Sequence, residues 1–204
     1  MERYLQGKLV SGGDEKLFAY DDGRVLPLSR LSAGNKELLP LFSVLEMYEY
    51  QRPSSVSSAR SGIGSTPALE FDDFFIEEPE AQVFPDMQRE LVCYFAELAN
   101  SDRLRFHSTI TTHSPYILSA FNNLIEASQV VAAKPEMKDE VARLIPGHYW
   151  LNSADFKAYC IHDGNLESIM DIETGLISAN YLDSVSETIG VEFDELLRLG
   201  YVES

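Results

Sequence analysis

Short runs of apolar residues, separated by glycine-containing turns, fill the start of the chain, and a helical spacing of apolar residues follows them. The runs Lys8–Val10 and Lys16–Tyr20 flank one such turn, and a third run follows the next. This pattern predicts an antiparallel β meander over residues 1–30. After Ser32, apolar residues recur every three or four positions, which predicts a helix that is irregular or kinked near Pro40.

The middle of the chain alternates between strand-like and helix-like segments. The expected elements are a buried strand over 69–76, further strands over 104–111 and 129–133, and helices over 85–100 and 114–122. Alternation of this kind predicts a parallel sheet with helices over its faces. Between the first helix and the first of these strands, residues 51–68 are rich in serine and glycine, and we expect a flexible loop there.

The last third of the chain has a different pattern. Two apolar runs on either side of His162–Asn165 predict a β-hairpin, and residues 179–199 read as one or two amphipathic helices. We therefore expect one domain, made of the meander, an α/β core over 31–133 and a C-terminal extension over 134–204.

Composition limits the classes of partner. The 204 residues are 45% hydrophobic and carry a formal net charge of −17, which disfavours an autonomous nucleic-acid-binding module. If nucleic acid is a partner at all, we expect it to be one only through a larger assembly. No apolar run is long enough to insert into a membrane, and no apolar signal follows Met1, so we expect a cytoplasmic protein.

Two adjacent carboxylates, Glu77 and Glu78, end the apolar run Phe74–Ile76 and precede Pro79. Successive side chains of a strand point to opposite faces, so the two acids are expected to do different work. One carboxylate can hold Mg²⁺, and the other can orient and deprotonate an attacking water. A strand end with solvated acids is the alternative, and the surrounding pattern favours the functional interpretation.

Two further groups suit phosphate chemistry. His113 follows a second apolar run, where its imidazole could hydrogen-bond a terminal phosphate and the attacking water. Ser32 and Gly34 lie at the start of the first long helix, where backbone N–H groups can face an anion. Taken alone, an ordinary helix cap explains Ser32 and Gly34 better.

Together these segments resemble the nucleotide-binding domain of ABC-type ATPases. Residues 32–36 (Ser-Ala-Gly-Asn-Lys) resemble the signature motif, and 74–81 resemble the Walker B strand with its catalytic glutamate. Residues 81–85 fall where the D-loop lies, and 112–114 (Thr-His-Ser) are similar to the switch-histidine segment. The residues of these motifs are most similar to those of the SMC/Rad50-like and OLD-like branch and of related bacterial AAA-type ATPases.

The resemblance implies a P-loop NTPase-like parallel sheet flanked by helices, and ATP and Mg²⁺ as cofactors. It implies that Glu77 stands at the Mg²⁺-linked acid, which is usually Asp, that Glu78 polarises the lytic water and that His113 senses the γ-phosphate. In that family ATP is held between two head-to-tail domains. The signature residues Ser32, Gly34 and Lys36 would then reach a nucleotide bound mainly by the opposite subunit, and Ala81 and Gln82 would lie at the seam of a homodimer.

One part of the family pattern is missing. The sequence holds no Gly-x-x-x-x-Gly-Lys-Ser/Thr loop to cradle phosphates, and the glycine-rich segment 61–66 lacks the lysine. We therefore expect an incomplete domain, namely the C-terminal half of an ATPase whose partner is the N-terminal half. Without that half, ATP turnover by the chain alone is expected to be slight.

Two alternatives remain open at this stage. The chain could be a non-catalytic interaction module derived from such an ATPase, although a scaffold has no chemical need for Glu78 or His113. It could also be a component of an OLD-like ATPase–nuclease, for which Asp163, Asp171 and Glu173 are the scattered candidate acids.

Overall fold

A computed structural model describes residues 2–13, 15–51, 72–101, 106–178 and 190–198. The chain divides into two compact units, Met1–Thr112 and His113–Ser204, and each unit is described by itself. The loop expected over 51–68 lies outside the described residues, except for Gln51 at the end of a helix.

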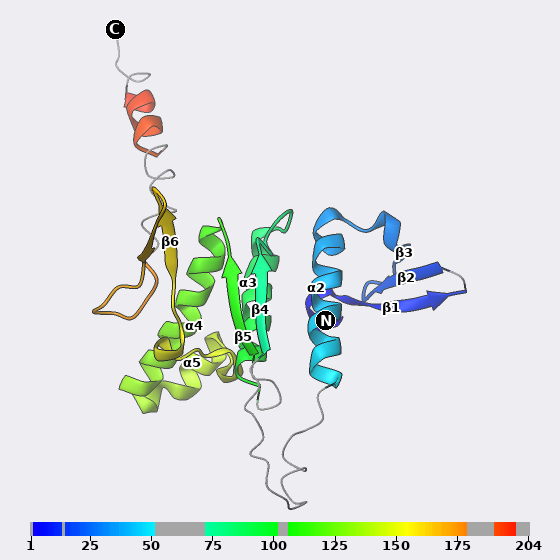
Figure 1. The fold of residues 1–204 in the computed structure, drawn as a ribbon, viewed down its shortest axis with the longest axis horizontal. Coiled ribbons are helices and arrows are strands. Elements are labelled where there is room, and N and C mark those ends of the chain that lie inside the picture. Colours follow the sequence, from blue (N-terminus) through cyan, green and yellow to red (C-terminus); the bar gives the residue numbers. More distant parts are fainter. Residues whose placement is uncertain (1, 14, 52–71, 102–105, 179–189, 199–204) are drawn as a thin grey trace, which may run out of the picture. The chain divides into compact units, whose positions relative to one another are not determined.

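The first unit opens with a small antiparallel sheet, as the turn-rich sequence predicts. A short helix, α1 (Glu2–Leu5), leads into strand β1 (Gly7–Gly12), which pairs with β2 (Glu15–Tyr20). Strand β3 (Val25–Pro27) pairs antiparallel with β2, which completes the meander (Figure 1). A single 3₁₀ turn, η1 (Leu28–Arg30), then connects the sheet to the first long helix.

That helix, α2 (Ala33–Gln51), begins where the sequence places it. The Asn35 N–H donates to the Ser32 hydroxyl oxygen at 3.3 Å, so Ser32 acts as the N-terminal cap. Pro40 lies inside the helix, and its side chain is exposed. The second long helix of the unit is α3 (Pro85–Ala99), which begins with the proline that the first helical turn tolerates.

Two parallel strands form the second sheet of this unit. Strand β4 (Asp72–Glu77) pairs with β5 (Phe106–Thr111) over six residues, from Asp72 opposite Phe106 to Glu77 opposite Thr111. The predicted parallel pairing is confirmed for these two strands, and no third strand joins them in the described part of the chain. A larger P-loop-type sheet stays a prediction.

An aromatic cluster holds α1, α2 and α3 together. The rings of Tyr4 and Phe42 stack at a centroid distance of 5.7 Å, and the Tyr94 ring lies 4.7 Å from Phe42 and 5.0 Å from Tyr4. The Tyr4 hydroxyl donates to the Glu97 carboxylate. Phe42 is fully buried, so this cluster is the centre of the core of the first unit.

The second unit begins with α4 (Pro115–Ala133), which is capped by the Ser114 hydroxyl. The strand predicted over 129–133 is wrong, because these residues form the last turns of α4. The β-branched pair Val130-Val131 suggested a strand, but no glycine or proline interrupts the helical pattern before Pro135.

Short elements make up the remainder of the second unit. The predicted hairpin is confirmed as β6 (Tyr159–His162) paired antiparallel with β7 (Asn165–Ser168). Between α4 and the hairpin lie η3 (Pro135–Met137), α5 (Lys138–Leu144), η4 (Gly147–Tyr149) and η5 (Ser153–Asp155). Residues 190–198 are helical, which agrees with the helix expected there, and 179–189 lie outside the described residues. No helix in the described part is long and apolar enough to cross a membrane.

Truncating the centre of the aromatic cluster tests this account of the core. Phe42→Ala is expected to lower the free energy of unfolding by about 3–5 kcal/mol, because it removes a fully buried ring and leaves a cavity. The control is Val44→Ala on the same helix, where the side chain is 52% exposed, and its cost is expected to stay below about 1 kcal/mol. Urea unfolding of both variants measures the difference, and equal costs would contradict the assignment.

The same cluster predicts a loss of stability at alkaline pH. Burial raises the pKa of the Tyr94 hydroxyl, and the carboxylates of Glu46, Glu49 and Glu97 raise it further. Burial and Glu97 also raise the pKa of Tyr4. An unfolded tyrosine loses its proton near pH 10, which is about its ordinary pKa. Below that pH the two tyrosines therefore do not reduce the free energy of unfolding, and this free energy falls as the pH rises above it.

Tyr94→Phe removes one of these two groups. The buried Tyr94 hydroxyl has no hydrogen-bond partner within the described residues, so phenylalanine fits the site. We expect the variant to be at least as stable as the parent at neutral pH and to lose less stability above about pH 10. Urea unfolding at a series of pH values measures both slopes, and parallel curves would disprove the role of Tyr94.

Candidate functional site

The candidate site lies at the carboxyl ends of β4 and β5. Glu77 is the last residue of β4, opposite Thr111 at the end of β5, and its side chain is exposed. Glu78 follows directly and is exposed as well. Ligands of open α/β sheets bind outside the carboxyl ends of the strands, so both acids lie at the edge where such sheets bind ligands.

Glu78 leaves the strand in an uncommon backbone conformation. Its φ of +41° lies in the left-handed region, which costs energy for a residue with a Cβ. Its N–H donates to the Thr111 carbonyl oxygen at 3.0 Å and lies 3.3 Å from the Thr111 hydroxyl. The next residue, Pro79, is buried. The end of β5 therefore holds Glu78 in a strained turn, and strain of this kind is frequent at functional sites.

A double turn continues from Glu78 to Val83. The Ala81 N–H donates to the Glu78 carbonyl oxygen, and the Val83 N–H donates to the Glu80 carbonyl oxygen, both at 2.9 Å. Gln82 also has a positive φ, of +59°. The turn is supported from α3, where the buried Gln88 amide donates to the Val83 carbonyl oxygen at 2.8 Å.

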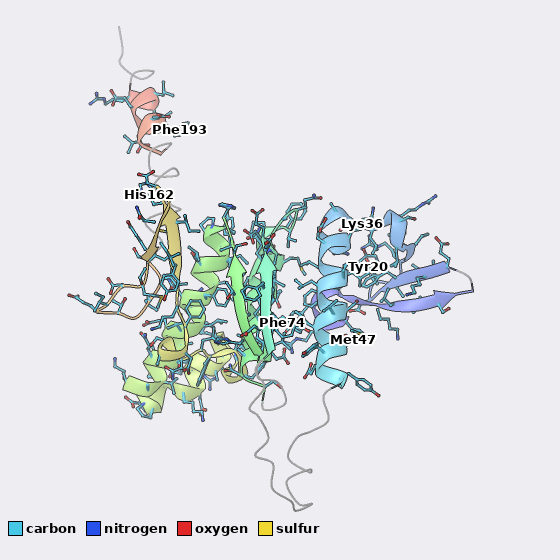
Figure 2. The ribbon with its side chains drawn as sticks, viewed as in Figure 1. Tyr20, Lys36, Met47, Phe74, His162 and Phe193 are labelled. Atoms are coloured by element: carbon cyan, nitrogen blue, oxygen red, sulfur yellow. The ribbon has the colours of Figure 1, made fainter. Side chains whose placement is uncertain are left out.

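The start of α2 meets this double turn, although about 45 residues separate them along the chain. A Cβ added at Gly34 would lie only 2.9 Å from the Gln82 carbonyl oxygen. Ser32 is exposed beside Gly34, and Lys36 is exposed in the first turn of the helix (Figure 2). The structure thus brings the signature-like segment and the D-loop-like segment together, and glycine is the residue that permits the contact.

His113 is the first residue of the second unit. Its side chain is exposed, and the residues on either side of it have structural contacts. Thr112 donates its hydroxyl to the Glu80 carboxylate at 2.6 Å, and Ser114 accepts from the N–H groups of Tyr116 and Ile117 as the cap of α4. A meeting of His113 with Glu78 around one phosphate stays a prediction.

A single exposed carboxylate such as that of Glu77 suits a magnesium ion whose other ligands are phosphate oxygens and water. In the part of the chain that the structure describes, no three His, Cys, Asp or Glu side chains cluster to hold a metal. Mg²⁺ commonly uses one or two carboxylates, substrate phosphate oxygens and water. An exposed carboxylate such as Glu77, at the edge of a parallel sheet, fits that arrangement.

Sequence reasoning missed Thr111, Thr112, Glu80 and Gln88 as supports of the site. The two threonines directly precede His113, and Glu80 lies in the Glu-Glu-Pro-Glu segment, so the motifs contained them. Only the hydrogen bonds show that they join the two strand ends. Gln88 is a single buried amide within a helix, and nothing in the pattern distinguished it.

One of the acids of the nuclease alternative, Asp171, has a contact of another kind. The Asp171 carboxylate accepts hydrogen bonds from the N–H groups of Glu173 and Thr174 and from the Thr174 hydroxyl. Hydrogen bonds from Thr174 are the main cause that lowers the pKa of Asp171. This carboxylate therefore stabilises a turn, as polar side chains in turns commonly do.

Comparison with known proteins identifies the family. Residues 3–118 match the model of the AAA ATPase domain, which is more than half of the chain. The chain belongs to the AAA ATPase domain family. No curated protein and no solved structure matches it. The matched part of this AAA ATPase domain includes the start of α2, the double turn after β4 and His113.

The contact between Gly34 and Gln82 gives a prediction with a definite sign. In an open helix, Gly→Ala stabilises by about 0.5–1 kcal/mol. At Gly34 the added methyl would meet a backbone oxygen, so Gly34→Ala is expected to destabilise by about 1–3 kcal/mol. Urea unfolding measures the change, and a gain in stability would show that the two segments do not touch.

Gly147→Ala is the matched control. The three atoms nearest to a Cβ at Gly147 would be Trp150 ring atoms at 3.8 Å, which is an ordinary contact distance. We expect this substitution to change the free energy of unfolding by less than about 0.5 kcal/mol.

Proposed function

We propose that the chain is the C-terminal, water-activating half of an ABC-type ATPase domain, of the SMC/Rad50-like or OLD-like branch of its family. Its reaction is Mg²⁺-dependent hydrolysis of ATP in a cytoplasmic assembly. On this proposal the whole chain, from the meander to the C-terminal extension, belongs to one partial ATPase domain. Hydrolysis drives a task such as DNA maintenance or phage defence.

The observation that carries the proposal is the placement of Glu78. The strained turn after β4 presents an exposed carboxylate at the carboxyl edge of a parallel strand pair, and Thr111 hydrogen-bonds its backbone. A carboxylate held in this way can orient a water and accept its proton as the water attacks the γ-phosphate. His113, which follows Thr112 directly, is proposed to hydrogen-bond the γ-phosphate.

Glu77 is the residue proposed to bind magnesium. It is the last residue of β4 and is exposed, so its carboxylate can meet a metal ion without the cost of burying a charge. When bound, the ion neutralises negative charge on the phosphates. Glu77 and Glu78 are thereby given different roles, since one residue lies within the strand and the other within the turn.

The start of α2 is proposed to reach the nucleotide of a second subunit. Ser32, Gly34 and Lys36 offer a hydroxyl, the N-terminus of a 19-residue helix and an exposed ammonium group. The contact between Gly34 and Gln82 places this helix start beside the D-loop-like turn of its own chain. Ser32, Ala81 and Gln82 are all exposed, so a head-to-tail homodimer can bring both segments to its seam.

The phosphate cradle is proposed to come from the N-terminal half of the domain. The sequence has no Gly-x-x-x-x-Gly-Lys-Ser/Thr loop, and β4 and β5 form a two-stranded parallel sheet in the described part of the chain. Parallel sheets normally have more than two strands and are covered on both faces. Strands from the N-terminal half would therefore extend this sheet.

Two measurements test the proposal. The purified 204-residue chain is expected to hydrolyse little or no Mg·ATP, because it lacks the loop that binds the phosphates; robust turnover would contradict this. In an assembly that supplies the N-terminal half, Glu78→Gln is expected to lower kcat by about 100- to 10,000-fold with nucleotide binding retained.

Glu90→Gln is the control. Glu90 lies on α3, pairs with the exposed Arg89 at 2.8 Å and has no part in the proposed site, so wild-type turnover is expected. If Glu78→Gln leaves the turnover of the assembly unchanged, Glu78 has no chemical role. This chain would then be a non-catalytic interaction module of an assembly whose catalytic carboxylate lies elsewhere.

A further inference from the structure

Two neighbouring threonines tie the end of β5 to the double turn that follows β4. Thr111 contacts the backbone of Glu78, since its carbonyl oxygen accepts from the Glu78 N–H at 3.0 Å. Thr112 contacts the side chain of Glu80, since its hydroxyl donates to the carboxylate at 2.6 Å. The first contact continues the pattern of the sheet, but the second joins two side chains beyond the ends of both strands.

The Thr112–Glu80 pair is well suited to hold its position. Both residues are half-buried, whereas Glu77 and Glu78 are exposed. A hydrogen bond from a hydroxyl to a carboxylate is short and stronger than one between neutral groups. Partial burial limits the competition from water, so the bond restrains both turns.

The restraint on Thr112 also affects the residue that follows it in the sequence. His113 is the next residue, and adjacent Cα atoms across a trans peptide are about 3.8 Å apart. The described part of the chain contains no cis peptide. Fixing Thr112 therefore restricts where the backbone of His113 can begin. Glu80 in turn lies two residues after Glu78 in the same double turn.

We propose that Glu80 and Thr112 are positioning residues, which tie the residue directly before His113 to the turn that carries Glu78. This inference rests on the proposed ATPase function, in which Glu78 and His113 act on one phosphate. It assigns the third acid of the Glu-Glu-Pro-Glu segment a role other than metal binding or proton transfer. The hydroxyl of Thr112 is the group on which this role depends.

Hydrogen exchange on the purified 204-residue chain gives the first test. Thr112→Val keeps the shape of the side chain and removes the donor, so the hydrogen-bonded backbone amides of Glu78, Ala81 and Val83 are expected to exchange about tenfold faster. Thr112→Ser retains the hydroxyl and is expected to restore the parent rates. Exchange in Thr112→Val that matches the parent would overturn the proposal.

Thr109→Val is the matched control. Thr109 is an exposed threonine two residues before Thr111 on β5, so this change removes a hydroxyl from the same strand. It is expected to leave exchange in both turns unchanged. If Thr109→Val accelerates exchange as much as Thr112→Val does, the effect belongs to strand β5 in general and the specific role of Thr112 is wrong.

Steady-state kinetics on the ATPase-active assembly gives the second test. Thr112→Val is expected to lower kcat by about tenfold and to leave KM for ATP within about twofold, because a misplaced His113 weakens the transition state more than nucleotide binding. Thr112→Ser is expected to restore kcat. If Thr112→Val keeps the parent kcat while Glu78→Gln is inactive, the positioning role fails and the ATPase proposal stands. If both variants keep the parent kcat, both proposals fail.

Discussion

The parallel register between β4 and β5 is the constraint on which the candidate site depends. It sets Glu77 opposite Thr111, so the residues after each strand leave the sheet at the same edge. The Glu78 N–H then finds the Thr111 carbonyl oxygen, and the Thr112 hydroxyl finds the Glu80 carboxylate. A shift of one strand by one residue would turn its side chains to the opposite face and break each of these contacts.

A second constraint is the close approach of α2 to the double turn. The backbone of Gly34 lies against the Gln82 carbonyl oxygen, and Gln88 holds the adjacent Val83 carbonyl oxygen from α3. Glycine makes the approach sterically possible, and the buried amide satisfies a carbonyl group that would otherwise lose its hydrogen bond. The start of α2 and the double turn that leads into α3 thus lie against each other.

The negative charge around Glu77, Glu78 and Glu80 limits which molecules can bind beside them. The chain has a formal net charge of −17, and Glu77, Glu78 and Glu80 lie within four residues of one another. A triphosphate is strongly anionic, so its approach to these acids requires positive charge. Under the proposed function that charge comes from Mg²⁺ and from the amino end of α2 and Lys36 of a second copy of the chain, and the N-terminal half of the domain adds its phosphate-binding loop.

Local patterning in the sequence determined the meander, the helices α2 and α3, the parallel pair and the C-terminal hairpin. It also determined which residue types end the two strands, because apolar runs and turn residues act over a few neighbouring positions. It misassigned residues 129–133, where β-branched side chains fit either a strand or the end of a helix. Only the tertiary structure decided that Gly34 meets Gln82, that Glu78 adopts a positive φ and that Thr112 binds Glu80. These contacts join residues more than 30 positions apart or depend on a strained backbone, and no local pattern encodes either feature.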